Sequence, residues 1–453
     1  MTKVLVIGLD CVPPELVFER YEKELPNISR LASQGIWGTL RSSTPPSSTN
    51  AWASMATSRD SSAIGIYDYV YRLNRSYKDI GVINSTLVKD DCVWDVISKN
   101  GRKVIVVNVP MTYPPKPVNG LMISGILTPE NAECTYPVEL QKELDEMTGG
   151  YRIKVPDPRL LERAELMEKL YELTKKRFKV IRHLINRKEW DFFMAVIYST
   201  DAMMHNFWRY IDNKHRKHEP DSEFRDAIKD FLIYVDEEIG SLLKIVDDDT
   251  AVVLMSDHGA HRMDGRVNVN EWLMREGYLH LKRKPKKTLS ILSADVDWGR
   301  TRAFALGAYY ASIYLNVKGR DPKGIVEQDQ TEALKKELID KLKNIRDDRG
   351  RKMDTIIFEP KPGDSAPDLL VYFDNLHWGA NSMVGSGSLY SWATEKGPDD
   401  AVHSTEGFFI ISGKGAKARS QKINADIRDI SPTVLKLMGI RIPDSMEGSP
   451  VGI

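Results

Sequence analysis

The sequence predicts an α/β fold with a mostly parallel central sheet, helices on both of its faces, and a smaller inserted cap subdomain. Two patterns predict the core: short apolar runs recur along the chain, and stretches between them repeat apolar residues every three or four positions. The alternation of strand and helix patterns is interrupted near residue 281, and this change in pattern predicts the insertion. We therefore expect a core of residues 1–280 and 396–453 and a cap of residues 281–395.

The first apolar run, Val4 to Leu9, is continuous rather than alternating, which is typical of a strand buried on both faces. Four further runs share this character: Val104–Val109, Phe192–Tyr198, Ala251–Met255 and Phe408–Ile411. Residues 159–187 and 222–246 have helical spacing, with charged residues on the opposite face. Strands that alternate with helices favour a parallel sheet, and ligands bind such sheets at the carboxyl ends of the strands.

The predicted cap begins near the basic run KRKPKK. It mixes a strand-like stretch (SIYLNV), a charged helical stretch (QTEALKKELIDKLKNI) and turns rich in Gly and Ser. The sheet pattern resumes at residues 405–411, and DIRDISPTVLKLMGI predicts a closing helix.

The bulk composition restricts the class of protein. Lys+Arg and Asp+Glu both number 64, so zero net charge argues against a nucleic-acid-binding surface over the whole molecule. The three cysteines lack CxxC spacing and predict neither a disulfide framework nor a zinc–thiolate site. The first apolar run is too short for a signal peptide, and no uncharged run reaches the ~18 residues of a membrane span. We expect a soluble cytoplasmic protein with no membrane partner, and its oligomeric state stays open.

Acidic residues and histidines lie at the ends of the predicted strands. The candidate metal ligands are Asp10, Asp201, His205, Asp257, His258 and His403. Asp201 and His205 are four residues apart and share a face of a helix, whereas Asp257 and His258 are adjacent after a strand. Each alone is commonly a helix cap, a surface pair or a structural residue. Gathered at one sheet edge, three carboxylates and three imidazoles suit two divalent cations, Zn²⁺ or Mn²⁺.

The stretch TPPSSTNAWASMATS, residues 44–58, places hydroxyl groups before a helical pattern. Most of these hydroxyls fit ordinary turn and helix-start chemistry. A metal-activated Ser or Thr at a helix N-terminus would, however, complete a two-metal site for displacement at phosphorus or sulfur.

These motifs together resemble the alkaline phosphatase superfamily, in its type I phosphodiesterase/nucleotide pyrophosphatase branch. The resemblance covers nearly the whole chain through VIGLD, PPSSTNAWASMATS, STDAMMH, SDHG, GPDDAVHSTEGFF and IRDISPTVLKLMGIRIPDSMEG. It implies an alkaline phosphatase-like three-layer sandwich and a metal-dependent phosphoric ester hydrolase.

The resemblance also implies a role for each ligand. Asp201, His205 and His403 would hold the metal that binds the attacking water. Asp10, Asp257 and His258 would hold the second metal, together with the nucleophile. A gapless match places the nucleophile on Ser48, with Thr49 as the alternative.

The chain departs from the family pattern at several positions. Asn50 replaces a Pro, Ser58 a Gly at the helix end, and Cys11 the Gly of GLDG. Cys11 either binds a soft ion or fills the pocket, and we expect the second. Asp68 lies where relatives carry a phosphate-contacting Asn, and a carboxylate repels phosphate unless it is paired or turned away.

Three residues are candidates for substrate contacts: Asn50, Asp68 and His377. The resemblance implies hydrolysis of a small phosphodiester or nucleotide through a phosphoseryl intermediate. A phosphomonoesterase or phosphotransferase of the same superfamily remains the alternative, and a non-catalytic binding protein on this fold is a further one.

Overall fold

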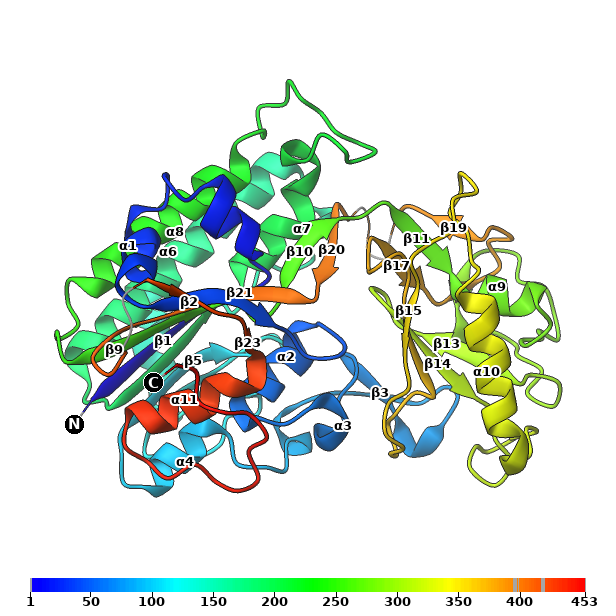
Figure 1. Ribbon diagram of the computed structural model, residues 1–453, viewed down its shortest axis with the longest axis horizontal. Coiled ribbons are helices and arrows are strands. Elements are labelled where there is room, and N and C mark those ends of the chain that lie inside the picture. The colour runs from blue at the N-terminus through cyan, green and yellow to red at the C-terminus, as the bar shows by residue number, and fades with distance from the viewer. Residues whose placement is uncertain (1, 394–396, 398, 417–419, 453) are drawn as a thin grey trace. The chain divides into compact units, whose positions relative to one another are not determined.

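The computed structural model describes residues 2–393, 397, 399–416 and 420–452 (Figure 1). The chain divides into two compact units: unit 1 is Met1–Ile64, Ile83–Ala260 and His403–Ile453, and unit 2 is Gly65–Val82 and His261–Val402. The range 281–395 predicted for the cap lies within unit 2. Its predicted boundary at 395/396 falls outside the described residues.

Among the described residues, unit 1 is built on a ten-stranded sheet in the order β22-β2-β21-β9-β1-β8-β5-β6-β7, with β23 also paired to β2. The strands are β1 (Lys3–Leu9), β2 (Ile36–Arg41), β5 (Val104–Val109), β6 (Gly120–Ser124), β7 (Thr135–Tyr136), β8 (Phe192–Ile197), β9 (Thr250–Met255), β21 (Glu406–Gly413), β22 (Gln421–Lys422) and β23 (Ala425–Asp426). The central strands β6, β5, β8, β1 and β9 are parallel, whereas β21 runs antiparallel to β9. The predicted mostly parallel sheet is confirmed.

Strand β1 shows why the apolar runs are continuous. Val4 pairs in register with Phe192 of β8 on one side and with Ala251 of β9 on the other. Every residue from Val4 to Leu9 is buried, because neighbouring strands flank β1 and helices cover both faces.

Helices cover the two faces of the central sheet as predicted (Figure 1). One face carries α1 (Pro26–Gln34), α6 (Arg163–Arg187), α7 (Ser199–Ile211) and α8 (Ala227–Leu243), and the other carries α2 (Ser48–Thr57), α4 (Val93–Lys99) and α11 (Ile430–Leu437). Unit 1 also contains α3 (Ser61–Ile64) and α5 (Leu140–Thr148). No helix within the described ranges is both long and apolar enough to cross a membrane.

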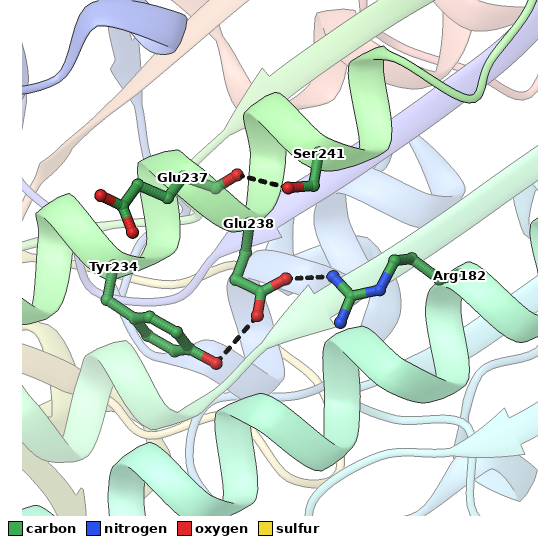
Figure 2. Close-up of a pocket in the computed structure, with 5 residues that line it drawn as sticks. All are labelled: Arg182, Tyr234, Glu237, Glu238 and Ser241. Carbon is green, nitrogen blue, oxygen red and sulfur yellow. Dashed lines mark hydrogen bonds and ion pairs between the residues drawn. The ribbon is translucent and has the colours of Figure 1, made fainter.

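An open pocket of about 330 Å³ lies between α6 and α8 (Figure 2). Its lining residues are Arg182, Tyr234, Glu237, Glu238 and Ser241. The Glu238 carboxylate pairs with Arg182 and accepts a hydrogen bond from the Tyr234 hydroxyl at 2.9 Å. The Arg182–Glu238 ion pair links α6 to α8 across the pocket.

Unit 2 consists of small sheets and two helices in its described part. A four-stranded antiparallel sheet has the order β13 (Ala303–Leu306), β14 (Ala311–Leu315), β16 (Leu369–Tyr372) and β15 (Ile356–Phe358). A second sheet has the order β17 (Trp378–Asn381), β11 (Gly265–Asn268) and β19 (Tyr390–Ser391). Two-stranded pairs join β3 (Val70–Arg72) to β4 (Ile80–Val82) and β12 (Leu289–Ser290) to β18 (Met383–Val384). A further pair joins β10 (Gly259–Arg262) to β20 (Ala401–Ser404), and each of these two strands has residues in both units. The helices are α9 (Val269–Arg275) and α10 (Thr331–Leu342).

The segment Gly65–Val82 is anchored in unit 2 by a buried arginine. Arg72 donates a hydrogen bond to Asp321 Oδ1 at 2.9 Å, and its guanidinium lies 5.0 Å from the ring centroids of both Phe304 and Tyr314. The Asp321 side chain is fully buried, so the pair is shielded from water. This contact joins residues 249 positions apart, and the sequence contains no local sign of it.

We expect Arg72→Met to destabilise unit 2 by about 3 kcal/mol, because it leaves the buried Asp321 carboxylate with one partner fewer. Urea unfolding followed by tryptophan fluorescence measures the change. The matched control is Arg75→Met, which removes a half-buried arginine whose guanidinium donates to the Gly363 carbonyl, and we expect it to cost less than about 1 kcal/mol. Equal effects of the two substitutions would contradict the anchoring role.

Candidate metal centre

Asp10 directly follows β1 and is fully buried. Its Oδ1 accepts a hydrogen bond from Ser48 Oγ at 3.0 Å, and its Oδ2 accepts one from Trp52 Nε1 at 2.8 Å. Trp52 lies against β1 because residue 8 is a glycine: a Cβ at Gly8 would come within 2.3 Å of the indole ring. Gly8 therefore allows Trp52 to orient the Asp10 carboxylate.

The hydroxyl of Ser48 lies among the predicted ligands. Ser48 is the first residue of α2, and its Oγ is 3.3 Å from His258 Nε2 in addition to its bond to Asp10. Thr49 Oγ1 instead donates to Asn50 Oδ1 at 3.4 Å. The start of α2 also adds backbone N–H donors and positive potential at this place.

Asp257 and His258 follow β9, the strand next to β1. His258 Nε2 is 3.3 Å from Asp257 Oδ2 and 3.7 Å from Asp10 Oδ1. The Nδ1 atom of His258 lies 3.1 Å from the Gly259 carbonyl oxygen, a contact in which Nδ1 donates. The structure thus places Asp10, Asp257 and His258 in one buried group whose ligand atoms lie within 4.8 Å of one another.

Asp201, His205 and His403 form a second buried group. Asp201 and His205 lie one turn apart on α7, with His205 Nε2 3.4 Å from Asp201 Oδ1. His403 Nε2 is 3.1 Å from His205 Nε2 and 3.8 Å from Asp201 Oδ1. The His403 and His258 rings stack with centroids 4.0 Å apart, so the two groups adjoin.

His403 reaches this edge of the sheet although it precedes its strand. It lies in β20, just before β21, which runs antiparallel to β9. The beginning of β21 therefore lies beside the carboxyl end of β9, where Asp257 follows. The reversed direction of β21 brings His403 to the residues that follow the parallel strands.

Burial and mutual repulsion shape the pKa values of the cluster. Burial raises the pKa of Asp10 well above its usual value, and the charges of Asp257 and Asp201 raise it further. Burial likewise raises the pKa of Asp257 and lowers that of His403 and His258. Burial opposes ionisation of Asp201 too, but attraction to His205 and the other imidazoles outweighs it and lowers its pKa overall.

The donor atoms fit divalent cations. His403 Nδ1 lies 2.8 Å from the Pro46 carbonyl oxygen and donates to it, so Nε2 presents its lone pair to His205. Asp257 Oδ2 is buried and has no hydrogen-bond donor. Imidazole Nε2 atoms held by Nδ1–H···O=C bonds, beside buried carboxylate oxygens, are the arrangement that metal-binding histidines adopt in proteins. Oxygen and nitrogen donors of this kind suit Zn²⁺ or Mn²⁺.

The sequence analysis did not identify two contributors to the cluster, Trp52 and the Pro46 carbonyl. The Cys11 thiol lies within the cluster, where its Sγ belongs to a buried group with Asp201, His258 and His403. Trp52 follows Ser48 by four residues, so helical spacing from the nucleophile candidate was an available signal.

Two predicted substrate contacts, Asp68 and His377, belong to unit 2, whereas Asn50 is in unit 1. Asp68 Oδ1 accepts a hydrogen bond from the Tyr69 backbone N–H at 2.7 Å, and burial raises the pKa of Asp68 to about 6. His377 stacks on His261 with ring centroids 4.0 Å apart. The substrate roles of Asn50, Asp68 and His377 stay predictions.

A family model described as type I phosphodiesterase/nucleotide pyrophosphatase matches residues 4–395. The chain belongs to this family. A comparison with curated proteins finds no match. Solved structures of the human and murine ectonucleotide pyrophosphatase/phosphodiesterase 5 are similar in fold, each with a TM-score of 0.55 and 11% identity. The human match covers 99% of this chain and 97% of that one, and the murine match covers 98% and 96%.

A third similar structure is an inactive variant of the murine protein in complex with AMP, also at a TM-score of 0.55. Membership in the type I phosphodiesterase/nucleotide pyrophosphatase family indicates a phosphoric ester hydrolase of that type. At 11% identity the structural likenesses show the fold, which is the alkaline phosphatase-like fold that the sequence predicted.

For this family member, we expect Asp257→Asn to raise the stability of the metal-free protein by about 1–2 kcal/mol. The substitution removes a buried carboxylate whose Oδ2 has no donor. It should also reduce the rise in melting temperature that we expect Zn²⁺ or Mn²⁺ to give the unchanged protein, because one of the two candidate cation sites loses a ligand. Differential scanning calorimetry with chelator and with each metal measures both effects, and a metal-induced rise that is undiminished in the variant would contradict the assignment.

We expect Asp68→Asn to stabilise the protein by about 1–2 kcal/mol at pH 8 and to have no effect near pH 4. The pKa of Asp68 is raised in the folded state from 3.8 to about 6, so its charged form costs stability once pH rises through that window. Urea unfolding at several pH values measures the difference, with the exposed Asp248→Asn as control. A difference that does not depend on pH would show that Asp68 is not desolvated.

Proposed function

We propose that this chain is a two-metal phosphodiesterase/nucleotide pyrophosphatase that acts through Ser48 and a phosphoseryl intermediate. The single observation that carries the proposal is the position of Ser48 Oγ, which bonds to Asp10 and contacts His258 at the start of α2. Family membership supports the reaction class, and the chemistry of the donor atoms supports two divalent cations, Zn²⁺ or Mn²⁺.

We assign Asp10, Asp257 and His258 to one cation together with Ser48, and Asp201, His205 and His403 to the other. The first assignment rests on the contacts of the Ser48 hydroxyl, which lies against Asp10 and His258. The second follows the triad whose donor atoms lie 3.1–3.8 Å apart. When bound, the two cations would activate the nucleophile and neutralise charge on the non-bridging phosphate oxygens.

The residues of this chain account for the first half-reaction. The Ser48 hydroxyl, which donates to Asp10 Oδ1, releases its proton to solvent as Oγ attacks phosphorus. A Ser–O–P bond forms as the bond to the leaving oxygen breaks, and the departing alcohol or nucleotide takes a proton from solvent. Backbone N–H groups at the start of α2 stabilise the negative charge that the phosphoryl oxygens carry.

Water completes the reaction by attacking the phosphoserine. The Ser–O–P bond breaks, Ser48 regains its proton, and the phosphate leaves as a monoester when the substrate was a diester. The structure of the murine relative contains AMP, and on that basis we propose a nucleotide-containing diester or pyrophosphate as the substrate of this chain. The Thr49 hydroxyl, which bonds to Asn50, is the weaker candidate for the nucleophile.

We expect Ser48→Ala to lower kcat on bis-p-nitrophenyl phosphate on the order of a thousand-fold or more with Zn²⁺ or Mn²⁺ supplied. Thr49→Val is the matched control and should retain activity within about tenfold, because its hydroxyl bonds to Asn50 rather than to the cluster. Acid quenching followed by peptide mass spectrometry should find the phosphoryl group on Ser48.

The reverse ranking of the two variants would assign the nucleophile to Thr49. A higher kcat/KM on p-nitrophenyl phosphate than on the diester would favour the phosphomonoesterase alternative. Equal, metal-independent background rates for all proteins would favour a non-catalytic binding protein.

A further inference from the structure

Cys11 occupies a backbone conformation that costs stability for a residue with a side chain. Its φ is +66°, in the left-handed region, where a non-glycine residue costs about 1–2 kcal/mol. Ser58 has a similar φ of +55°, but its hydroxyl donates to the Arg428 carbonyl at 2.7 Å and accepts from the Gly448 N–H at 2.9 Å. Two good hydrogen bonds offset the cost at Ser58.

The hydrogen bonds at Cys11 are weaker. Cys11 Sγ lies 3.6 Å from the Gly259 carbonyl oxygen, and a thiol is a weak donor. The thiol also contacts the His205 imidazole. Neither contact accounts for a cysteine at a position that glycine would occupy without strain.

The position of the sulfur supplies a different explanation. Cys11 Sγ lies within 4.8 Å of ligand atoms on Asp201, His258 and His403, and all four residues are buried. Nδ1 of His403 donates to a backbone carbonyl, so its Nε2 carries a lone pair at this place, 3.1 Å from His205 Nε2. In the adjoining group of Asp10, Asp257 and His258, the buried Asp257 Oδ2 has no hydrogen-bond donor either. The thiol thus faces a place where donor atoms already point to a cation.

We propose that Cys11 Sγ is a ligand of the cation held by Asp201 and His403. The proposal rests on the metal centre of the proposed function. On binding, the thiol gives up its proton to solvent and the sulfur forms the coordinate bond. The two cation sites then differ: Asp10, Asp257 and His258 offer only oxygen and nitrogen, whereas the site at Cys11 also offers sulfur and prefers Zn²⁺ to Mn²⁺ or Mg²⁺.

The decisive measurement is zinc K-edge X-ray absorption on the zinc-loaded full-length chain. In the Cys92→Ser/Cys134→Ser variant Cys11 is the only thiol, since the sequence holds three cysteines. We expect a sulfur shell at about 2.3 Å in that variant. The shell should be lost when Cys11→Ser is added, which distinguishes the thiolate from methionine sulfur.

Metal preference is the second readout. Cys11→Gly suits the left-handed φ and removes the sulfur, so it should fold. We expect its affinity ratio for Zn²⁺ over Mn²⁺ to fall about tenfold or more, measured by competition with a chelating indicator. Cobalt loading should give a thiolate charge-transfer band in the near ultraviolet for the unchanged protein and none for Cys11→Gly.

The outcomes separate this inference from the proposed function. Zinc bound through nitrogen and oxygen alone, with an unchanged metal preference in Cys11→Gly, overturns the role of Cys11 and leaves the hydrolase proposal intact. A protein that binds neither Zn²⁺ nor Mn²⁺ overturns both. If Cys11→Ser fails to fold, the spectrum of Cys92→Ser/Cys134→Ser still decides, because absence of a sulfur shell there refutes the ligand.

Discussion

The carboxyl edge of the central sheet buries carboxylates that repel one another, together with imidazoles, and the rest of unit 1 holds them there. Asp10 and Asp257 follow adjacent parallel strands and are both fully buried. Burial raises the pKa of both, which means that their ionised forms are costly without a compensating charge. A flexible loop would relax away from this arrangement. Strands β1, β8 and β9, buried on both faces, do not.

Backbone carbonyls and one indole fix the donor atoms of the cluster. His258 and His403 each direct Nδ1 to a carbonyl oxygen, of Gly259 and Pro46 respectively, and so turn Nε2 toward the carboxylates. Trp52 holds Asp10 from the helix that also carries Ser48. These partners do not titrate, so the groups that orient the ligands keep the same charge at every pH.

The sequence could predict the sheet and the gathering of its Asp and His residues, because both follow from local patterns. Continuous apolar runs mark buried strands, and parallel strands end at one edge whatever their order. The antiparallel direction of β21 and the anchoring of Arg72 to Asp321 depend on contacts between distant residues. No periodicity within the sequence encodes such contacts. We expected the Cys11 thiol only to fill the pocket. The sequence shows that residue 11 carries a thiol, but it does not show the left-handed φ of that residue.

The two groups of ligands are not equivalent, and the difference follows from what each adjoins. The group of Asp10, Asp257 and His258 contacts the Ser48 hydroxyl at the start of α2. The positive potential of that helix end suits attack by an oxygen nucleophile. The group of Asp201, His205 and His403 adjoins the Cys11 thiol, and its His403 ring stacks on His258. A softer set of donors holds a cation more covalently and leaves it less electrophilic than oxygen donors would. In the proposed mechanism, unequal surroundings would give the two cations different properties, and each cation would serve a different nucleophile, serine first and then water.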